Sequence, residues 1–269
     1  MGGNLRPSFW RVFWINALFA PKTSLGFMRI DFILGTIFII PFTQMLFFAF
    51  VAQLATNASS PIAYVVVGNA VATVTYSAIF SVCQTTDSEK NAGTMEHLLV
   101  SPANRLALYF GRGLIPILIS LATVSIALVY AVVLFGAEFA PGAAAELAVS
   151  IVLTAFAMVG FGLLLGGVAL FFRTSIILGN IFLFIGLLLS GVNFPVSALP
   201  VPLQWVGWGL PLTWGIASIR AGLAGAPIGE LLPLWGLVGL CAVVAFGLSI
   251  GLWETFERRA LSTGSIARF

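Results

Sequence analysis

Charged residues are rare in this sequence. Lysine, arginine, aspartate and glutamate together make up 8% of the 269 residues, whereas 60% are hydrophobic. Soluble domains carry roughly 25% charged residues, so the composition excludes an ordinary soluble domain. The chain is predicted to be an integral membrane protein, and its net charge of +3 gives no reason to expect nucleic acid as a partner.

Cysteine and histidine are also scarce. The chain has two cysteines, Cys83 and Cys241, and one histidine, His97. Without a Cys-x-x-Cys pair or further histidines, the sequence provides neither a disulfide framework nor a zinc site. We expect no metal, and the cysteines are interpreted as small packing residues.

Lysine occurs only at Lys22 and Lys90. A P-loop needs a glycine-rich turn followed directly by lysine in order to hold phosphates, and neither lysine follows such a turn. The chain is therefore expected not to be an ATPase, to have no catalytic residues and to bind no cofactor itself.

Long apolar runs dominate the sequence. A transmembrane helix needs about 20 consecutive apolar residues, and such runs occur at residues 32–55, 61–83, 113–136, 147–172, 174–192 and 231–253. The predicted fold is all-α, a polytopic membrane protein with six transmembrane helices in a single domain, residues 1–269. The fifth run is short and residues 193–230 form no clean span, so five to seven spans fit the sequence.

The positions of lysine and arginine predict the orientation. Loops rich in these residues stay in the cytoplasm. Placing both termini in the cytoplasm puts every basic residue except Arg220 on the inside, and it puts Glu138 and Glu146 in or beside outside segments. Both termini are therefore predicted to be cytoplasmic.

The segment before the first span, residues 1–31, combines aromatic and basic side chains. These include Trp10, Trp14, Arg6 and Arg11. Both types favour the headgroup zone of a bilayer, which predicts an interfacial N-terminal helix. The alternative is a disordered leader.

Prolines and glycines predict local features of the spans. Pro41 lies inside the first span and predicts a kink. The pair Gly162 and Gly166 and the pair Gly247 and Gly251 have the GxxxG spacing that lets helices approach closely.

Residues 193–230 contain five prolines, so one straight helix through this segment is not expected. We predict two short helices that enter the membrane from the outer face and return, a re-entrant pair. Trp205, Trp208 and Trp214 would then lie near the outer interface, either as an aromatic belt or in contact with a substrate.

The main polar interruption is the segment 84–112, which is predicted to be cytoplasmic and to lie between spans two and three. Within it, Thr94 is a suitable N-cap, Glu96 lies in the first helical turn and Pro102 ends the helix. This pattern predicts a short helix that is not stable alone.

One face of this short helix is apolar. Met95, Leu98 and Leu99 share that face at spacing i, i+3, i+4. Either the face docks on a partner protein, or the helix lies on lipid or on the protein's own loops.

Two stretches resemble a known family. The first consists of Glu89, Lys90, Gly93, Thr94, Glu96, Leu98, Leu99, Ser101 and Pro102. It is similar to the cytoplasmic-loop signature of type-2 ATP-binding-cassette (ABC) permeases, the membrane subunits of drug, antibiotic and polysaccharide exporters. Asn91 departs from this signature, which often has an acidic residue there.

The second stretch is similar to the segment that precedes the last span in the same family. It consists of Ser190, Gly191, Phe194, Pro195, Leu199, Pro200, Leu203, Gln204, Leu210, Pro211, Leu212, Thr213 and Arg220. With six spans, the two stretches extend the resemblance over nearly the whole chain.

The resemblance implies that the short cytoplasmic helix is a coupling helix, seated in a groove of a separate ATPase subunit. The residues expected at this contact are Glu89, Gly93, Thr94, Met95, Glu96, His97, Leu98, Leu99 and Pro102. Two copies of the ATPase, which bind ATP and Mg, and a second permease copy or a sister permease would complete the complex. Its expected location is the lipid of a prokaryotic cell (inner) membrane.

The polar residues inside the spans are uncharged, and they are interpreted as a substrate pathway. They are Gln44, Asn69, Thr73, Tyr76 and Asn180. An uncharged path suits an amphiphilic or lipophilic cargo such as a drug, antibiotic or lipid, and a lipid-linked polysaccharide is the alternative cargo. The other role open to these residues is hydrogen bonding between helices.

Two further classes of membrane protein fit the sequence less well. An ion-coupled secondary transporter usually places ionisable residues within the membrane, whereas nearly every charge here falls at a helix end or in a loop. A non-transporting assembly subunit would not need the coupling signature. The ABC exporter permease is therefore the favoured interpretation.

Overall fold

The computed structural model describes residues 10–15, 34–54, 62–91, 105–140, 142–169 and 175–263, and all of its regular elements are helices. They are a π-helical turn η1 (Gly35–Ile39), α3 (Ile40–Leu54), α4 (Ile62–Asn91), α6 (Arg105–Val133), α7 (Ala144–Ala169), α8 (Ser175–Leu189), a 3-10 turn η2 (Val196–Ala198), α9 (Val201–Gly209), α10 (Pro211–Leu223) and α11 (Ile228–Thr263). Residues 10–15 form a further short helical segment.

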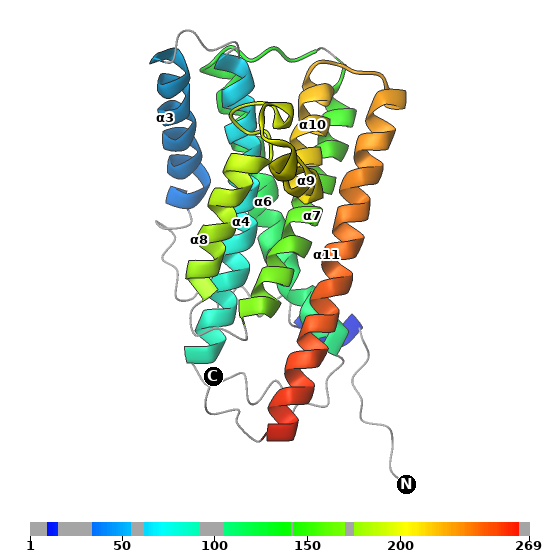
Figure 1. Cartoon of the computed structure of the whole chain (residues 1–269). Coiled ribbons are helices and arrows are strands. Elements are labelled where there is room, and N and C mark those ends of the chain that lie inside the picture. Colours follow the sequence, from blue (N-terminus) through cyan, green and yellow to red (C-terminus); the bar gives the residue numbers. More distant parts are fainter. Residues whose placement is uncertain are drawn as a thin grey trace.

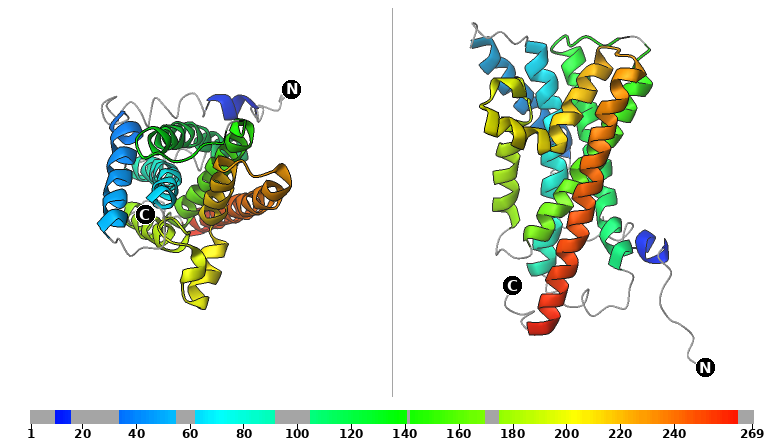
Figure 2. Two further views of the ribbon diagram at one scale, coloured as in Figure 1. Left: turned by 90° about the horizontal axis from the view of Figure 1, so that it is seen from above. Right: turned by 45° about the vertical axis from the view of Figure 1, so that its right-hand side comes forward.

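The helices form a bundle around α4. Helix α4 packs against α3, α6, α7, α8 and α10, while α11 packs against α7 and α10 on the other side (Figures 1 and 2). The buried share of the apolar part of each helix is 83% for α4, 17% for the segment that contains α3 and 28% for α11. Helix α4 is therefore the central helix of the bundle, and α3 and α11 are peripheral.

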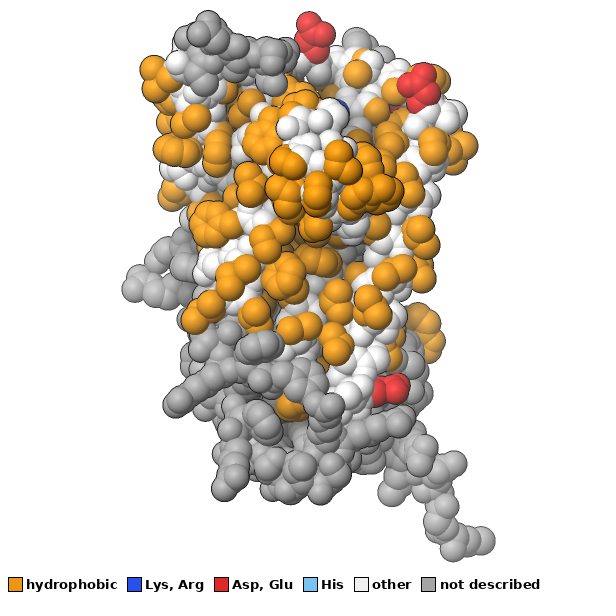
Figure 3. Space-filling view, viewed as in Figure 1, with side chains coloured by type: hydrophobic (Ala, Val, Ile, Leu, Met, Phe, Trp, Pro, Cys, Tyr) orange, Lys and Arg blue, Asp and Glu red, His pale blue; other side chains and the backbone are white. Residues whose placement is uncertain are grey.

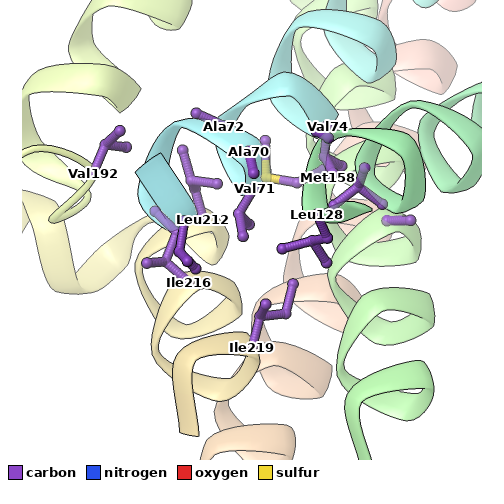
Figure 4. Packing of buried hydrophobic residues seen from close by; sticks show 14 of the residues in the cluster. Ala70, Val71, Ala72, Val74, Leu128, Met158, Val192, Leu212, Ile216 and Ile219 are labelled. Atoms are coloured by element: carbon purple, nitrogen blue, oxygen red, sulfur yellow. The ribbon is translucent and has the colours of Figure 1, made fainter. Parts of the chain in front are cut away.

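The hydrophobic cluster between these helices consists almost entirely of aliphatic side chains. Figure 4 shows Leu212, Ile216 and Ile219 of α10 near Val71 of α4, with Met158 of α7 in the same cluster. All five side chains are almost fully buried. Since lipid tails are as apolar as this core, the helices associate through close van der Waals packing more than through exclusion of water.

Large apolar side chains cover the outside of the bundle. More than half of the side chain is exposed at Phe47, Phe50, Phe184, Leu188, Leu232, Leu240, Val243 and Leu248. Figure 3 shows apolar side chains over the middle of the viewed face, and the acidic side chains visible on this face lie toward its two ends. Such a surface would be an aggregation site in water, so the chain is a multi-pass membrane protein.

Among the described residues, five helices are long and apolar enough to cross a membrane, and they begin and end near the predicted spans. They are Gly35–Leu54, Ile62–Cys83, Gly113–Val133, Ala144–Val168 and Ile228–Phe256. The predicted span 174–192 is occupied by α8, whose 15 residues are fewer than a full crossing requires. The all-helical membrane fold is therefore confirmed for the described residues, and five of the predicted spans have the length of a crossing.

Some predicted boundaries need correction. The segment 84–112 is not all loop, because α4 continues to Asn91 and α6 already begins at Arg105. Helix α11 begins at Ile228, inside the predicted segment 193–230, and runs on to Thr263. Hydropathy marks only the apolar part of a helix, and these helices extend beyond it into polar sequence.

The irregularity predicted at Pro41 is a widened turn. Proline donates no backbone hydrogen bond, and its ring pushes against the preceding turn. The turn just before it, Gly35–Ile39, is a π-helix, in which the N–H of Ile40 donates to the carbonyl of Gly35. The Thr43 hydroxyl donates to the carbonyl of Ile39 at 2.9 Å, just after the widened turn.

Candidate functional site

Two of the predicted pathway residues meet between α3 and α4. The Nε2 of Gln44 donates to the Oδ1 of Asn69 at 3.2 Å. Asn69 is completely buried, and its Nδ2 donates to the carbonyl of Val65 one turn earlier at 2.9 Å. The pair is a neutral polar contact in an apolar bundle, the kind of contact that joins transmembrane helices.

A third carboxamide joins this pair from a distant part of the chain. The Nδ2 of Asn69 also donates to the Oδ1 of Asn193, at 2.8 Å. Asn193 lies in the non-helical turn that follows α8, residues 190–194. Gln44, Asn69 and Asn193 therefore form a chain of carboxamides linking α3, α4 and this turn.

The remaining pathway residues lie apart from these three carboxamides. Thr73 is buried one turn further along α4, and its hydroxyl donates to the carbonyl of Ala70 at 2.6 Å. Tyr76 is half-buried, and its ring stacks on Phe80 with centroids 4.5 Å apart. Asn180 is half-buried on α8. Asn69, Thr73 and Tyr76 follow one another along α4, as their spacing predicts.

The turn 190–194 is held by a second polar cluster, on its other side. The guanidinium of Arg220 on α10 donates to three backbone carbonyls: Gly191 at 3.0 Å, Val192 at 3.0 Å and Tyr64 at 2.8 Å. Tyr64 itself donates its hydroxyl to the carbonyl of Gly191 at 3.2 Å. These bonds tie α10 and α4 to the end of α8.

Arg220 is an unusual cation because its guanidinium donates to three backbone carbonyls. No carboxylate in the described part of the chain pairs with it, and its Nε is buried without an acceptor. Its charge is stabilised instead by carbonyl oxygens beyond the C-terminus of α8 and by the face of the Tyr64 ring, 3.4 Å away.

Two glycines make this arrangement possible. Gly191 has φ of +75°, a conformation that glycine adopts without strain. A Cβ on Gly68 of α4 would lie 2.1 Å from the carbonyl oxygen of Val192 and 2.6 Å from the Nη2 of Arg220. Only a residue without a side chain allows the turn to approach α4 this closely.

Three residues of this site were not predicted as part of it. Neither Tyr64 nor Asn193 belongs to a predicted site, and Arg220 belongs only to the second family stretch and to the predicted outer segments. An available signal was that Arg220 is the only basic residue between Arg173 and Arg258, in otherwise apolar sequence. A cation in such a segment needs acceptors, and the nearby break after α8 provides them.

The predicted ATPase contact lies mostly outside the described residues. This applies to Gly93, Thr94, Met95, Glu96, His97, Leu98, Leu99 and Pro102, and Glu89 lies in the last turn of α4, where only the backbone is described. Among the residues that the structure describes, no group of three or more His, Cys, Asp or Glu could hold a metal ion.

Comparison with known proteins places this bundle in context. The family model described as "ABC-2 type transporter" matches residues 7–224. The chain is also 29% identical over 124 residues to the "Probable multidrug ABC transporter permease YbhR" of Escherichia coli K12, and equally to the protein of that name from Escherichia coli O157:H7. The alignment covers 46% of this chain and 33% of the relative, so the similarity spans only a third of the relative's length.

Proposed function

Because this chain belongs to the ABC-2 type transporter family, we propose that it is the membrane-spanning subunit of an ATP-driven exporter. The observation that carries the proposal is the family match over residues 7–224 in a chain of apolar, membrane-length helices. ATP and Mg would be bound by a separate ATPase, since neither lysine of the chain follows a glycine-rich turn.

The proposed complex contains two ATPase chains and two permeases, the second permease being either another copy or a sister chain. The short helix that the sequence predicts after α4 would contact the ATPase through Met95, Leu98 and Leu99. This position suits a coupling element, since the central helix α4 leads directly to it and α6 begins at Arg105, soon after it. A movement of this short helix would be transmitted to the core of the bundle through α4 and α6.

The proposed orientation puts α4 with its start at the outer face and its end in the cytoplasm of a prokaryotic cell. The upper end of the bundle in Figure 1, where α4, α7 and α11 begin, would be the outer end. Helices α9 and α10 lie in this upper half and would form the re-entrant pair. With α8 as the fifth crossing, the membrane would be spanned six times.

The proposed cargo is amphiphilic or lipophilic, such as a drug, an antibiotic or a lipid. The pathway would run along Gln44, Asn69, Thr73, Tyr76 and Asn180, which are uncharged. The name of the Escherichia coli relative, a probable multidrug permease, points to the same class. A lipid-linked polysaccharide is the second candidate cargo, because the family resemblance includes polysaccharide exporters.

Reconstitution tests the proposal. The permease is placed in vesicles with or without its ATPase, and transport of a fluorescent lipophilic dye is followed after addition of ATP and Mg. We expect transport only when both chains and ATP are present, and none with a hydrolysis-deficient ATPase. Dye transport driven by an ion gradient in vesicles without the ATPase would instead indicate a secondary transporter.

A further inference from the structure

The turn 190–194 closes over the most deeply buried polar side chain of the proposed pathway. Asn69 has no exposed surface, and its carboxamide is bonded to Asn193 at 2.8 Å and to Gln44 at 3.2 Å. Both covering residues are themselves only half-buried. The turn and α3 therefore separate Asn69 from the surroundings of the chain.

The two halves of this turn are held by bonds of different strength. Gly191 and Val192 are fixed through their carbonyls by the charged guanidinium of Arg220. The side chain of Val192 is also completely buried in the apolar cluster shown in Figure 4. Asn193, the next residue, is bonded to Asn69 by a neutral amide hydrogen bond. Charged hydrogen bonds are roughly twice as strong as neutral ones, so the contact of Asn193 is the one that opens more easily.

The chemistry of the contact also suits repeated opening. A carboxamide carries both donors and acceptors, so Asn69 and Asn193 can exchange their mutual bond for bonds to water or to a neutral polar group of a cargo. An ion pair at the same place would resist separation and would select by charge. The carboxamides of Gln44, Asn69 and Asn193 are neutral, so they neither resist separation strongly nor select a cargo by its charge.

The position of the contact is at one end of the polar track along α4. Asn69 is the pathway residue of α4 nearest to the helix start at Ile62, and Thr73 and Tyr76 follow toward the other end. In the proposed orientation, the contact between Asn193 and Asn69 thus lies at the outer end of the track.

We propose that Asn193 is the movable seal of an outer gate, which closes the cargo pathway by its bond to Asn69 while Arg220 holds the adjoining backbone in place. This inference rests on the proposed function for the existence of the pathway. When the gate opens, Asn193 leaves Asn69, and the track at Thr73 becomes accessible from outside.

The first test needs no ATP. In a chain with Cys83 and Cys241 replaced by alanine, Thr73→Cys introduces a thiol below the seal and removes one methyl group. Labelling by a membrane-impermeant thiol reagent from outside should be slow at rest. Adding Asn193→Ala should speed it by about fivefold, the effect of losing one neutral hydrogen bond of about 1 kcal/mol.

Two controls accompany this measurement. Asn193→Asp keeps an acceptor for the Asn69 amide and should leave labelling at Thr73→Cys slow. Thr154→Cys is the matched thiol, since Thr154 is also completely buried but lies on α7 against Gly215 of α10. Its labelling should not change with Asn193→Ala. An unchanged rate at Thr73→Cys, or an equal rise at Thr154→Cys, would overturn the proposal.

The second test separates the gate from the proposed function. In vesicles that contain the ATPase, ATP should raise labelling of Thr73→Cys and leave Thr154→Cys unchanged. If Asn193→Ala speeds labelling but ATP does not, the seal stands and ATP-driven coupling fails. If ATP drives dye export while Asn193→Ala leaves labelling unchanged, the proposed function stands and the gate is wrong.

Discussion

The guanidinium of Arg220 lies over the ring of Tyr64, with Cζ 3.4 Å from the ring centroid, and its Nη2 donates to the carbonyl oxygen of the same tyrosine at 2.8 Å. One side chain of α10 thus contacts both the ring and the backbone of a residue in the first turn of α4. The same guanidinium also bonds the two carbonyls that follow the end of α8. Helices separated by more than a hundred residues in sequence are joined at this point.

Replacing Arg220 should destabilise the protein strongly. Hydrogen bonds to charged groups contribute about 1.5–3 kcal/mol each, and Arg220→Gln removes the charge from three of them. We expect a loss of at least about 3 kcal/mol, measured as a lower unfolding midpoint by tryptophan fluorescence in detergent. The unfolding midpoint of Arg220→Lys should lie between those of the unmodified chain and Arg220→Gln, because lysine keeps the charge but lacks the planar guanidinium group.

A neutral hydrogen bond elsewhere provides the control. Trp235 donates its Nε1 to the Oγ of Ser150 at 2.8 Å, between α11 and α7. Trp235→Phe removes this bond, which should contribute about 0.6 kcal/mol in a membrane bundle, and it also reduces the side-chain volume. If Arg220→Gln had the same unfolding midpoint as the unmodified chain, the hydrogen bonds of Arg220 to the turn 190–194 would not stabilise the fold.

Two glycine-to-alanine substitutions should have opposite outcomes. In Gly68→Ala, the new Cβ would overlap the Val192 carbonyl oxygen and Arg220, neither of which can move without breaking the cluster. We expect a loss of about 1–3 kcal/mol, typical of overpacking. Gly239→Ala meets no atom within 4 Å and should be neutral or slightly stabilising, since alanine favours helix. Equal unfolding midpoints for the two variants would contradict the close approach at Gly68.

Much of the fold could be predicted from the sequence because the bilayer imposes a length on apolar runs. The span predicted at 61–83 begins within one residue of α4, which starts at Ile62, and the one at 147–172 overlaps nearly all of Ala144–Ala169. The continuation of α4 to Asn91 was missed, since hydropathy does not report on helix outside the lipid.

Close helix contacts were predicted less well. Gly162 of the first GxxxG pair does approach α4, where its Cβ would lie 3.0 Å from the carbonyl oxygen of Ala78. Gly247 and Gly251 have the same spacing, yet nothing within the described chain lies within 4 Å of a Cβ on either. The most confined glycine, Gly68, belongs to no such motif. The spacing places two glycines on one face of a helix, but what packs there depends on the tertiary arrangement.

The candidate site was predicted only in part for the same reason. Gln44 and Asn69 were identified because each is polar within an apolar run. Asn193 lies in a non-helical turn and is 124 residues from Asn69, so no helical periodicity relates the two. Contacts made by such turns depend on how the chain folds back, which local sequence patterns do not report.

Labelling from the two sides of the membrane tests the orientation. A cysteine at Ala144, at the start of α7, should react with an impermeant maleimide added to intact cells, and one at Asn91 should react only after permeabilisation. Ala144 is preferred to the neighbouring Gly142, whose φ of +95° does not suit a side chain. Reaction of the Asn91 cysteine in intact cells would place the proposed coupling helix on the outer side of the membrane and contradict the proposed orientation.

The ATPase contact can be tested with Leu98→Asp. If Leu98 enters the ATPase groove, the new carboxylate is buried without a partner, which costs about 3 kcal/mol or more. Affinity for the ATPase should fall about 100-fold, measured by co-purification from detergent, and dye export should fall with it. Insertion into the membrane should be unaffected, because the substitution lies outside the apolar runs.

Two milder substitutions in the same segment define what Leu98→Asp measures. Leu98→Met keeps an apolar side chain of similar volume and should retain ATPase binding. Glu96→Ala removes only a charge in the first helical turn, a contribution of about 0.3–1 kcal/mol at an exposed site, and should weaken binding about fivefold at most. If the Leu98→Asp permease retained its ATPase and exported at the unmodified rate, the apolar face of Met95, Leu98 and Leu99 would not be the coupling surface. The movement driven by ATP hydrolysis would then have to reach α4 and α6 through another contact with the ATPase.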